Sequence, residues 1–336
     1  MGTPADIWYS GTPSVRAACL IRNNFSSSRL RKTSRTASFS NSTVIVRIEG
    51  TILQVHDPFQ MYAKAPIGIF DSGYGGLTVF RSIWERLPQY DYLYLGDNAR
   101  APYGSRSFST VYEYTLECVT WMFSQGCPLV ILACNTASAR ALRTIQQHDL
   151  PGMAPDRRVL GIIRPTAEVI GLYTESGVVG VLGTKGTIQS GSYETEISHQ
   201  FPQVQVYGEA CPLWVPLVEA GEHEDPGADY FVKKHLQTLL AQDSRMDAVL
   251  LACTHYPLLE QKIRQHLPQG VALISQGPIV AESLADYLLR HPEMDERISA
   301  GASTRFFTTD APESFDGPAS RFFGQPVKSE LLDLTP

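Results

Sequence analysis

The chain has 336 residues, of which 43% are hydrophobic, and its formal net charge is -6. This length predicts two domains of ordinary size, and no apolar run approaches the roughly 18 residues of a membrane helix. Residues 1–60 hold seven basic and three acidic residues, which leaves 21 basic and 31 acidic residues for the rest. An acidic body lacks the basic stripe of a nucleic-acid-binding surface, so neither nucleic acid nor a membrane is an expected partner.

The first sixty residues differ in composition from the rest of the chain. No acidic residue occurs between Ile7 and Ile48, whereas Ser, Thr, Asn and Arg are frequent. No apolar segment follows the basic residues, so a secretory signal peptide is not expected. An organelle transit peptide and an upstream start codon, with Met61 as the natural first residue, both remain open. Either alternative predicts weak order in residues 1–60.

From residue 66 onward, short apolar runs alternate with helical patterns, which is typical of parallel α/β proteins. We expect strands over 67–70, 92–95 and 129–132. The first ends in the turn D-S-G-Y-G-G that starts at Asp71, and a helix follows it. A longer helix is expected over 108–125. The third strand leads into Cys134, where another helix is expected to start.

The second half of the chain repeats this plan. Strands are expected over 178–182 and 248–251, and they end at Gly183 and just before Cys253. Gly183 thus matches Asp71, and Cys253 matches Cys134. The two halves have similar internal spacing, 63 residues in the first and 70 in the second. The repeat predicts two lobes related by a pseudo-twofold axis.

Both matched cysteines follow a strand, and ligands of open parallel sheets bind beyond the carboxyl ends of the strands. Two facing lobes would therefore enclose a cleft with Cys134 on one side and Cys253 on the other. Inverting an amino acid requires removing the Cα proton from one face and returning a proton to the other. A thiol and a thiolate on opposite faces meet that need, and helix N–H groups favour the thiolate form. The alternative, that each is an inert core cysteine, applies less well to two cysteines in repeated contexts.

The other cysteines have no such context, and no pair is spaced as CxxC. Six cysteines in so long a chain are too few for a disulfide scaffold. Reduced thiols in a cytoplasmic protein without a metal site are therefore expected. Structural or incidental roles are expected for the remaining four, which are Cys19, Cys118, Cys127 and Cys211.

Five segments of the chain resemble the signature blocks of the glutamate racemase family. The similarity extends from about residue 66 to residue 325, so it covers nearly the whole body, and the blocks together are highly specific. They are Asp71-Ser72-Gly73-Tyr74-Gly75-Gly76, Pro102-Tyr103-Gly104, Ala133-Cys134-Asn135-Thr136-Ala137-Ser138, Cys211-Pro212 through Pro216 to Glu219, and Cys253-Thr254-His255-Tyr256-Pro257.

The resemblance implies a role for each residue in these blocks. Cys134 and Cys253 would be the two proton donors and acceptors, Asp71 and His255 would assist their respective thiols, and Glu219 would lie near the site. The substrate would be bound by Asp71, Ser72, Tyr103, Gly104, Asn135, Thr136, Thr254 and His255. Hydroxyl, amide and backbone N–H groups suit the carboxylates of glutamate, and a carboxylate such as Asp71 suits its ammonium group.

Simpler roles remain open for several of these residues. Asp71 could only cap the following helix, and His255 could be an ordinary structural histidine. Tyr103 could be a packing aromatic, with Gly104 only making a turn, and Glu219 could be a surface charge. Arg164 departs from the family pattern. We expect it to lie in a strand and turn, at a position where the family would have an acidic or apolar residue.

The fold expected from these patterns is α/β, with two pseudo-twofold-related parallel-sheet lobes and the active site in the cleft between them. The first lobe would comprise residues 66–161 and 271–336, and the second residues 162–270. An amphipathic helix over 279–290 would pack back on the first lobe, and residues 306–324, rich in Phe and Gly, would form a tail.

The expected function is cofactor-independent racemisation of L-glutamate to D-glutamate, which by resemblance supplies D-glutamate for peptidoglycan and cell-wall biosynthesis. The expected partners are L- and D-glutamate and a second copy of the chain in a homodimer. Two alternatives stay open: a racemase for aspartate or another acidic amino acid, and a two-lobed amino-acid-binding module without turnover. A dinucleotide-dependent oxidoreductase is disfavoured, because the turn at Asp71 lacks the GxGxxG spacing.

Overall fold

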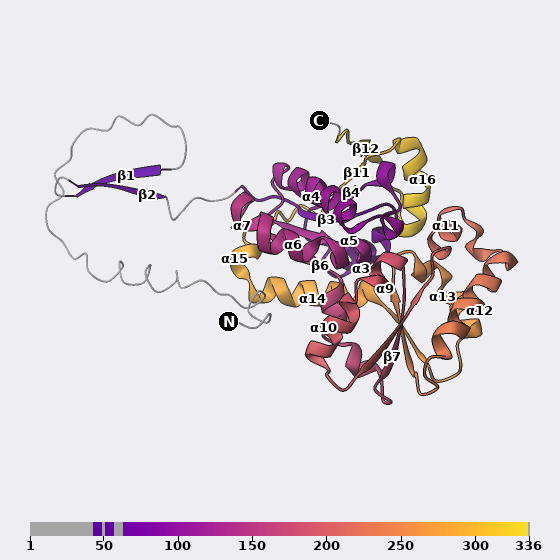
Figure 1. The fold of residues 1–336 in the computed structure, drawn as a ribbon. Coiled ribbons are helices and arrows are strands. Elements are labelled where there is room, and N and C mark those ends of the chain that lie inside the picture. Colours follow the sequence, from indigo (N-terminus) through magenta and orange to yellow (C-terminus); the bar gives the residue numbers. More distant parts are fainter. Residues whose placement is uncertain (1–42, 49–50, 57–62, 335–336) are drawn as a thin grey trace. The chain divides into compact units, whose positions relative to one another are not determined.

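The computed structural model describes residues 43–48, 51–56 and 63–334 (Figure 1). Contacts within the chain divide it after Met61 into a short unit and the main body. In the short unit, β1 (Thr43–Ile48) and β2 (Thr51–His56) pair in antiparallel fashion. The sequence does not predict this pairing, and the remaining positions of the segment expected to be weakly ordered lie outside the described residues.

The first sheet of the main body has six strands, all parallel, in the order β12-β11-β4-β3-β5-β6. The three strands expected in the first half of the chain are confirmed. These strands are short, and the three expected ones are fully buried, as the continuous apolar runs of parallel sheets require. The bounds are β3 Ile67–Asp71, β4 Tyr92–Gly96, β5 Leu129–Leu132, β6 Arg158–Gly161, β11 Thr304–Thr308 and β12 Ser329–Leu331.

The second sheet has four parallel strands in the order β10-β9-β7-β8. They are β7 Val178–Gly183, β8 Gln205–Ala210, β9 Ala248–Ala252 and β10 Ala272–Ser275. The order β8-β7-β9-β10 reproduces the order β4-β3-β5-β6 of the first sheet strand for strand. The two parallel sheets confirm the expected α/β class, and the repeat seen in the sequence is a repeat of topology.

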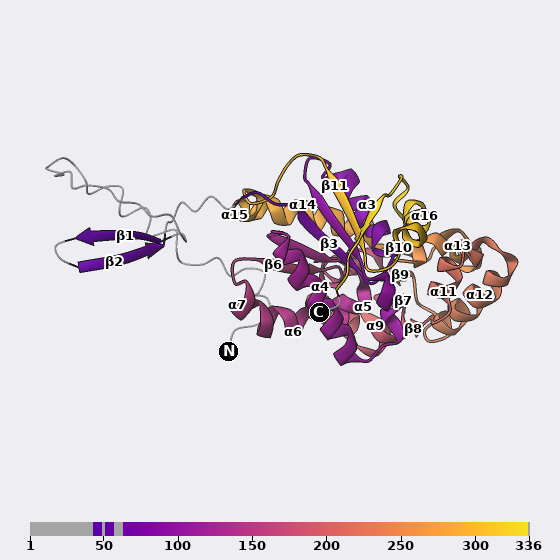
Figure 2. The same ribbon diagram turned by 90° about the horizontal axis from the view of Figure 1, so that it is seen from above.

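Helices cover both faces of each sheet (Figures 1 and 2). On the first sheet, Leu93 and Leu95 pack in a core with α4, whereas Tyr92 and Tyr94 face Phe80 of α3. On the second sheet, α8 and α10 cover one face and α12 packs on β7 and β8. These helices are α3 Gly76–Arg86, α4 Phe108–Ser124, α8 Ile163–Ala167, α10 Ser192–Gln200 and α12 Pro226–Leu240.

Shorter helices connect these elements. Six are α-helices: α5 Asn135–Arg140, α6 Leu142–Thr144, α7 Leu150–Met153, α9 Lys185–Gln189, α11 Trp214–Glu219 and α13 Glu260–His266. Tighter or wider turns complete the connections, namely η1 Asn98–Arg100, η2 Tyr103–Ser105, the π-helix η3 Ile145–Asp149, η4 Ile170–Tyr173, η5 Glu222–Glu224 and η6 Tyr256–Leu259. Among the described residues, no helix is long and apolar enough to cross a membrane.

The chain crosses between the sheets twice. It leaves the first sheet after β6 through α8, and it returns after β10 through α14 (Gln276–Arg290), which packs along α3. Because β10 pairs with β9, the return comes after residue 275 and not at 271 as expected. The helix expected over 279–290 is present and starts three residues earlier.

Arg164 lies within α8 and not in a strand and turn as expected. Its guanidinium contacts Glu168 one helical turn later, at 2.9 Å between Nε and Oε1. The proline after Arg164 suggested a turn, but proline is also tolerated in the first turn of a helix, which is where Pro165 lies.

The segment expected to be a C-terminal tail is a structured part of the first lobe. It forms β11 and α16 (Pro312–Phe323), which follow α15 (Pro292–Asp295). Phe80 stacks on Phe323 at 5.1 Å between ring centroids and contacts Phe306 edge-on at 6.2 Å. The sequence does not predict α16, because it contains Gly317 and Pro318, and both residue types are unfavourable inside helices.

Phe80→Ala is expected to lower the free energy of unfolding by about 3–5 kcal/mol, because it leaves a cavity where α3, β4, β11 and α16 meet. Urea denaturation followed by circular dichroism measures the loss. Leu289→Ala is the control, since Leu289 is 82% exposed and its loss should stay within about 0.5 kcal/mol. Equal losses in both variants would contradict this description of the core.

Candidate active site

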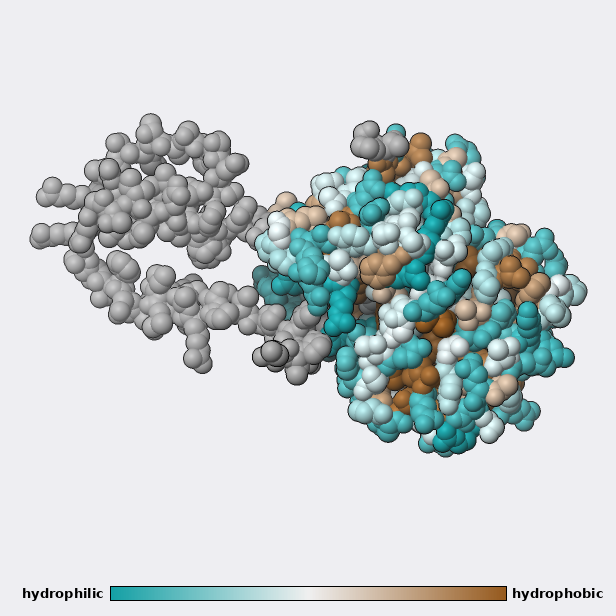
Figure 3. Space-filling model, viewed as in Figure 1, coloured by the Kyte–Doolittle hydropathy of each residue, from teal (hydrophilic) through white to brown (hydrophobic). Residues whose placement is uncertain are grey.

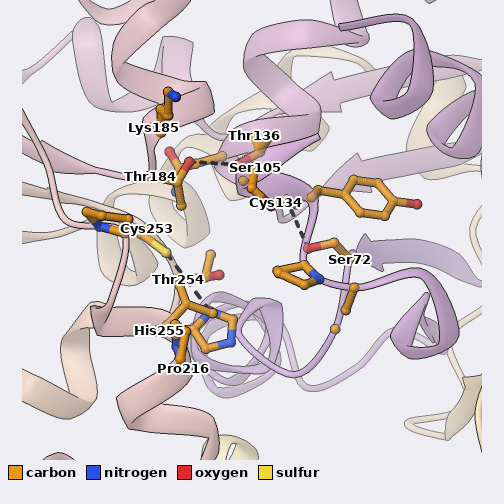
Figure 4. Close-up of a pocket in the computed structure, with 18 of the residues that line it drawn as sticks. Ser72, Ser105, Cys134, Thr136, Thr184, Lys185, Pro216, Cys253, Thr254 and His255 are labelled. Carbon is orange, nitrogen blue, oxygen red and sulfur yellow. Dashed lines mark hydrogen bonds between the residues drawn. The ribbon is translucent and has the colours of Figure 1, made fainter. Parts of the chain in front are cut away.

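The carboxyl ends of the two sheets border one cavity of about 130 Å³. Figure 4 shows Cys134 and Ser72 entering it from one side and Cys253, Thr254 and His255 from the other. The lining residues are Ser72, Gly73, Ala101, Pro102, Tyr103, Gly104, Ser105, Cys134, Asn135, Thr136, Thr184, Lys185, Cys211, Pro212, Val215, Pro216, Glu219, Cys253, Thr254 and His255.

Cys134 is the N-cap residue of α5 and lies two residues after the end of β5. Its Sγ lies 3.5 Å from the backbone nitrogen of Ala137 and 3.5 Å from Ser72 Oγ. Burial nevertheless raises the pKa of the Cys134 thiol to about 12, and the nearby Asp71 carboxylate adds to the rise. The N–H of Ala137 favours the thiolate as expected, but burial outweighs this one long contact and keeps the pKa of the thiol above its ordinary value.

Asp71 ends β3 and is 1% exposed. Its Oδ2 accepts a hydrogen bond from the Gly73 backbone nitrogen at 2.9 Å. Its Oδ1 is buried and has no hydrogen-bond partner among the described residues. Burial raises the pKa of Asp71 above its ordinary value, against the opposing charge of His255. Asp71 does not line the cavity, so it acts behind the surface that a substrate would touch.

Cys253 lies in the second lobe in a different electrostatic setting. It follows β9 and precedes His255 and η6, so no α-helix N-terminus adjoins its sulfur. Its Sγ is 4.0 Å from His255 Nδ1, and His255 Nε2 is 3.0 Å from Glu219 Oε1. Glu219, the last residue of α11, is thus a partner of His255 and not an isolated surface charge.

The neighbours of His255 favour its protonated form. Burial alone would lower its pKa, but the contacts with Cys253 and Glu219 outweigh burial and raise the pKa to about 10. The ring of Phe322 in α16 packs against it edge-on, with ring centroids 5.3 Å apart. The His255 ring thus faces the Cys253 sulfur on one side and the Glu219 carboxylate on the other. The site therefore holds one thiol beside a carboxylate and one beside a cation.

The expected substrate-binding residues, Asp71 apart, line the cavity, and they differ in what their side chains offer. The Tyr103 hydroxyl donates a hydrogen bond to Asp97, and its ring packs on Phe70 and Tyr114, so only its ring is available. A Cβ on Gly104 would lie 2.8 Å from Thr184 Cβ, so glycine permits the two lobes to approach there. The other cavity-lining members of the expected set are Ser72, Asn135, Thr136, Thr254 and His255.

Several lining residues were not among the site residues expected from the sequence, and three of them carry polar or sulfur-containing side chains of chemical interest. Thr184 Oγ1 lies 3.0 Å from Thr136 Oγ1 across the cleft. The internal repeat carries a signal for it, because Gly183 matches Asp71 and Thr184 therefore matches Ser72. Cys211, expected to be incidental, lines the cavity directly after β8. Lys185 is at the rim, and its side chain extends away from the two cysteines in Figure 4.

Comparison with known proteins agrees with this geometry. The family model described as Asp/Glu/Hydantoin racemase matches residues 67–284. The curated glutamate racemase of Geobacter metallireducens is 40% identical over 77% of this chain and 92% of its own length, and that of Paracoccus denitrificans is 39% identical over 79% and 98%. The chain belongs to the glutamate racemase family.

Solved structures of glutamate racemases share the fold of this chain. Isoform RacE1 from Bacillus anthracis aligns with a TM-score of 0.73 at 34% identity, covering 80% of this chain and 98% of that one. The Francisella tularensis enzyme, solved in complex with D-glutamate, aligns with a TM-score of 0.72 at 29% identity, covering 81% and 98%. The chain is thus an amino-acid racemase, an isomerase.

The His255 ring is expected to stay protonated from pH 6 to pH 8 in the unliganded protein. Its pKa of about 10 lies above the ordinary 6.5. The stability that its charge contributes is therefore present below pH 6.5 and is lost as the pH rises through about 10. Glu219→Gln should lower the pKa, because it removes the carboxylate. NMR of ¹³C-labelled histidine measures the His255 pKa in the wild type and in Glu219→Gln, with His255→Asn used to assign the signal. A His255 pKa near 6.5 in the wild type would refute this expectation.

Gly75→Ala is expected to reduce kcat/KM on the order of 100-fold by displacing the loop of the second lobe that carries Thr254 and His255. A Cβ on Gly75 would lie 2.3 Å from Thr254 Oγ1 and 2.4 Å from His255 Nδ1. Gly227→Ala is the matched control, because its Cβ would meet nothing within 4 Å. Steady-state racemisation rates compare the two variants, and an active Gly75→Ala enzyme would contradict the close packing.

Proposed function

We propose that this protein interconverts L- and D-glutamate by two-base proton transfer between the substrate and the thiols of Cys134 and Cys253, without a cofactor. The observation that carries the proposal is that two cysteines from equivalent strand ends, β5 and β9, line the same cavity. A binding protein needs no matched pair of thiols, whereas inversion at Cα needs an acid and a base on opposite faces.

The charged neighbours of the two thiols support different roles for them in the resting enzyme, one as acid and the other as base. Cys134 is a thiol because of its burial beside Asp71, which makes it the proton donor. Cys253, beside the His255 imidazolium, is the base. Removal of the Cα proton by Cys253 and delivery of the Cys134 proton to the other face inverts the substrate, and the charges of the two sulfur atoms are then exchanged.

Asp71 and His255 make the reverse direction possible. Asp71 Oδ1 is a buried acceptor without a partner among the described residues, so it can take up a proton as Cys134 becomes the base. His255 can return a proton to Cys253, and Glu219 keeps the imidazole ring charged and oriented. Each thiol thus has its own proton-exchanging neighbour, which a reversible reaction requires.

The neutral donors of the cavity support an acidic amino acid as the substrate. Hydroxyl groups of Ser72, Thr136, Thr184 and Thr254 surround the two sulfur atoms. Such hydroxyl groups can donate hydrogen bonds to the carboxylates of a substrate. The relatives named glutamate racemase, one of them in complex with D-glutamate, favour glutamate over aspartate.

The biological role that fits this reaction is the supply of D-glutamate for peptidoglycan and the cell wall, in the cytoplasm. The proposed chemistry requires free thiols, and Cys118, Cys127, Cys134, Cys211 and Cys253 are all free. A reducing compartment preserves such thiols.

A homodimer is the proposed assembly, as the family resemblance implies. The face in Figure 3 is largely hydrophilic with separate hydrophobic patches, and large apolar side chains such as Leu172 and Tyr230 are exposed. Sedimentation velocity at micromolar concentration tests this assembly.

Incubation with L-glutamate in D₂O, without added cofactor, tests the function. The circular dichroism of glutamate should decay to zero while deuterium enters Cα. Cys134→Ser and Cys253→Ser should each slow the decay at least about 100-fold. Cys127→Ser is the matched control, because Cys127 is a buried free thiol outside the cavity.

Three other outcomes would redirect the assignment. Full activity in either cavity variant would refute the two-thiol mechanism. Racemisation of aspartate with a higher kcat/KM would reassign the substrate. Binding without turnover, unchanged by loss of either thiol, would indicate an amino-acid-binding module.

A further inference from the structure

Asn135, the residue after Cys134, belongs to a closed ring of buried hydrogen bonds. Its Nδ2 donates to Gln276 Oε1 at 2.7 Å, Gln276 Nε2 donates to the Tyr193 hydroxyl at 2.7 Å, and that hydroxyl donates to Asn135 Oδ1 at 2.5 Å. All three side chains are at most 3% exposed. The ring contains no charged group.

The direction of every bond in the ring follows from one backbone carbonyl. The carbonyl oxygen of Ile162 can only accept, and it lies 3.1 Å from Gln276, so that atom must be Nε2. The Thr166 hydroxyl donates to the same carbonyl and lies 3.0 Å from Nε2, so one of the two Nε2 hydrogens is shared between this carbonyl and this hydroxyl, and the other is left for Tyr193. Oε1 of Gln276 then faces Asn135, which must present Nδ2 to it, and Asn135 Oδ1 is left to accept from Tyr193.

The ring lies where the chain passes between its two sheets. Ile162 and Thr166 belong to the first crossing, and Gln276 is the first residue of α14, which makes the second crossing. Tyr193 belongs to α10 on the second sheet, and Asn135 begins α5 on the first. Gln276 therefore connects both crossings to the helix that carries Cys134 at its N-cap.

The amide of Asn135 keeps one hydrogen for a ligand. Nδ2 has two hydrogens, of which the ring uses one, and no described residue accepts the other. Asn135 also lines the cavity. A rotation of the amide by 180° would instead turn its oxygen to the cavity, where it would repel a carboxylate. The ring forbids this rotation, because it would set Oδ1 against Gln276 Oε1.

We propose that Tyr193 and Gln276 are positioning residues for racemisation, which hold the Asn135 amide with an N–H toward a carboxylate of the substrate. This inference rests on the proposed function. Neither residue lines the cavity, so both act through Asn135. Their loss should therefore weaken substrate binding and leave the proton-transfer step largely intact.

Tyr193→Phe tests the proposal, because it removes the hydroxyl and leaves the ring of the side chain. The KM for glutamate should rise about tenfold or more, whereas kcat should change less than about threefold. Tyr92→Phe is the matched control, since Tyr92 is equally buried and its hydroxyl donates to the Leu87 carbonyl at 2.7 Å. It should leave both constants unchanged. Gln276→Met, a second variant of similar shape, should raise KM in the same way.

A double-mutant cycle separates positioning from a general structural effect. In an Asn135→Ala background, Tyr193→Phe should change kcat/KM less than twofold, because the residue through which it acts is gone. The same loss in both backgrounds would overturn the inference, as would an unchanged KM in Tyr193→Phe. Wild-type protein assayed in parallel distinguishes failure of the proposed function from failure of the positioning role. If the wild type does not racemise glutamate, both the proposed function and this inference are wrong.

Discussion

The cost of burying charge governs this site. Cys134, Asp71 and His255 are withdrawn from water, and burial opposes the charged form of each. Only His255 overcomes that opposition, because Cys253 and Glu219 both contact its ring. One sulfur therefore keeps its proton while the other adjoins a positive charge. Two chemically identical side chains thus have different charged neighbours, which is a condition for an acid and a base to coexist in one small cavity.

The repeated topology explains why these groups meet. Each half of the chain builds the same four-strand order, so β5 and β9 occupy equivalent central positions and end at the same edge of their sheets. The turn of the first lobe around Gly75 packs on the loop that carries Thr254 and His255, leaving no room for a side chain. The close fit of the two lobes thus positions the residues that line the cavity as well as stabilising the fold.

The sequence is informative where a residue's role depends on its local context, and much less so elsewhere. Apolar runs with turns revealed the central strands, and the repeated strand-end position revealed Cys134 and Cys253. The helix α16 was missed because Gly317 and Pro318 disguise a segment that tertiary packing keeps helical. Cys211 and Gln276 were missed because their importance comes from partners far along the chain: Gln276 meets Asn135, 141 residues away. The raised pKa of Cys134 follows from burial, which no local pattern encodes.

Because Phe322 packs on His255, the surroundings of this histidine are completed by a segment that is synthesised after it. Both cysteines leave the ribosome well before α16 does, since Phe322 follows Cys253 in the chain. A nascent chain that has already formed both sheets' central strands still lacks the aromatic wall behind its catalytic imidazole. The N-terminal portion of a protein folds first during translation, so the aromatic ring that packs on His255 is added after every residue that lines the cavity has been made. A chain truncated before α16 would contain both thiols but would lack the packing of Phe322 against His255.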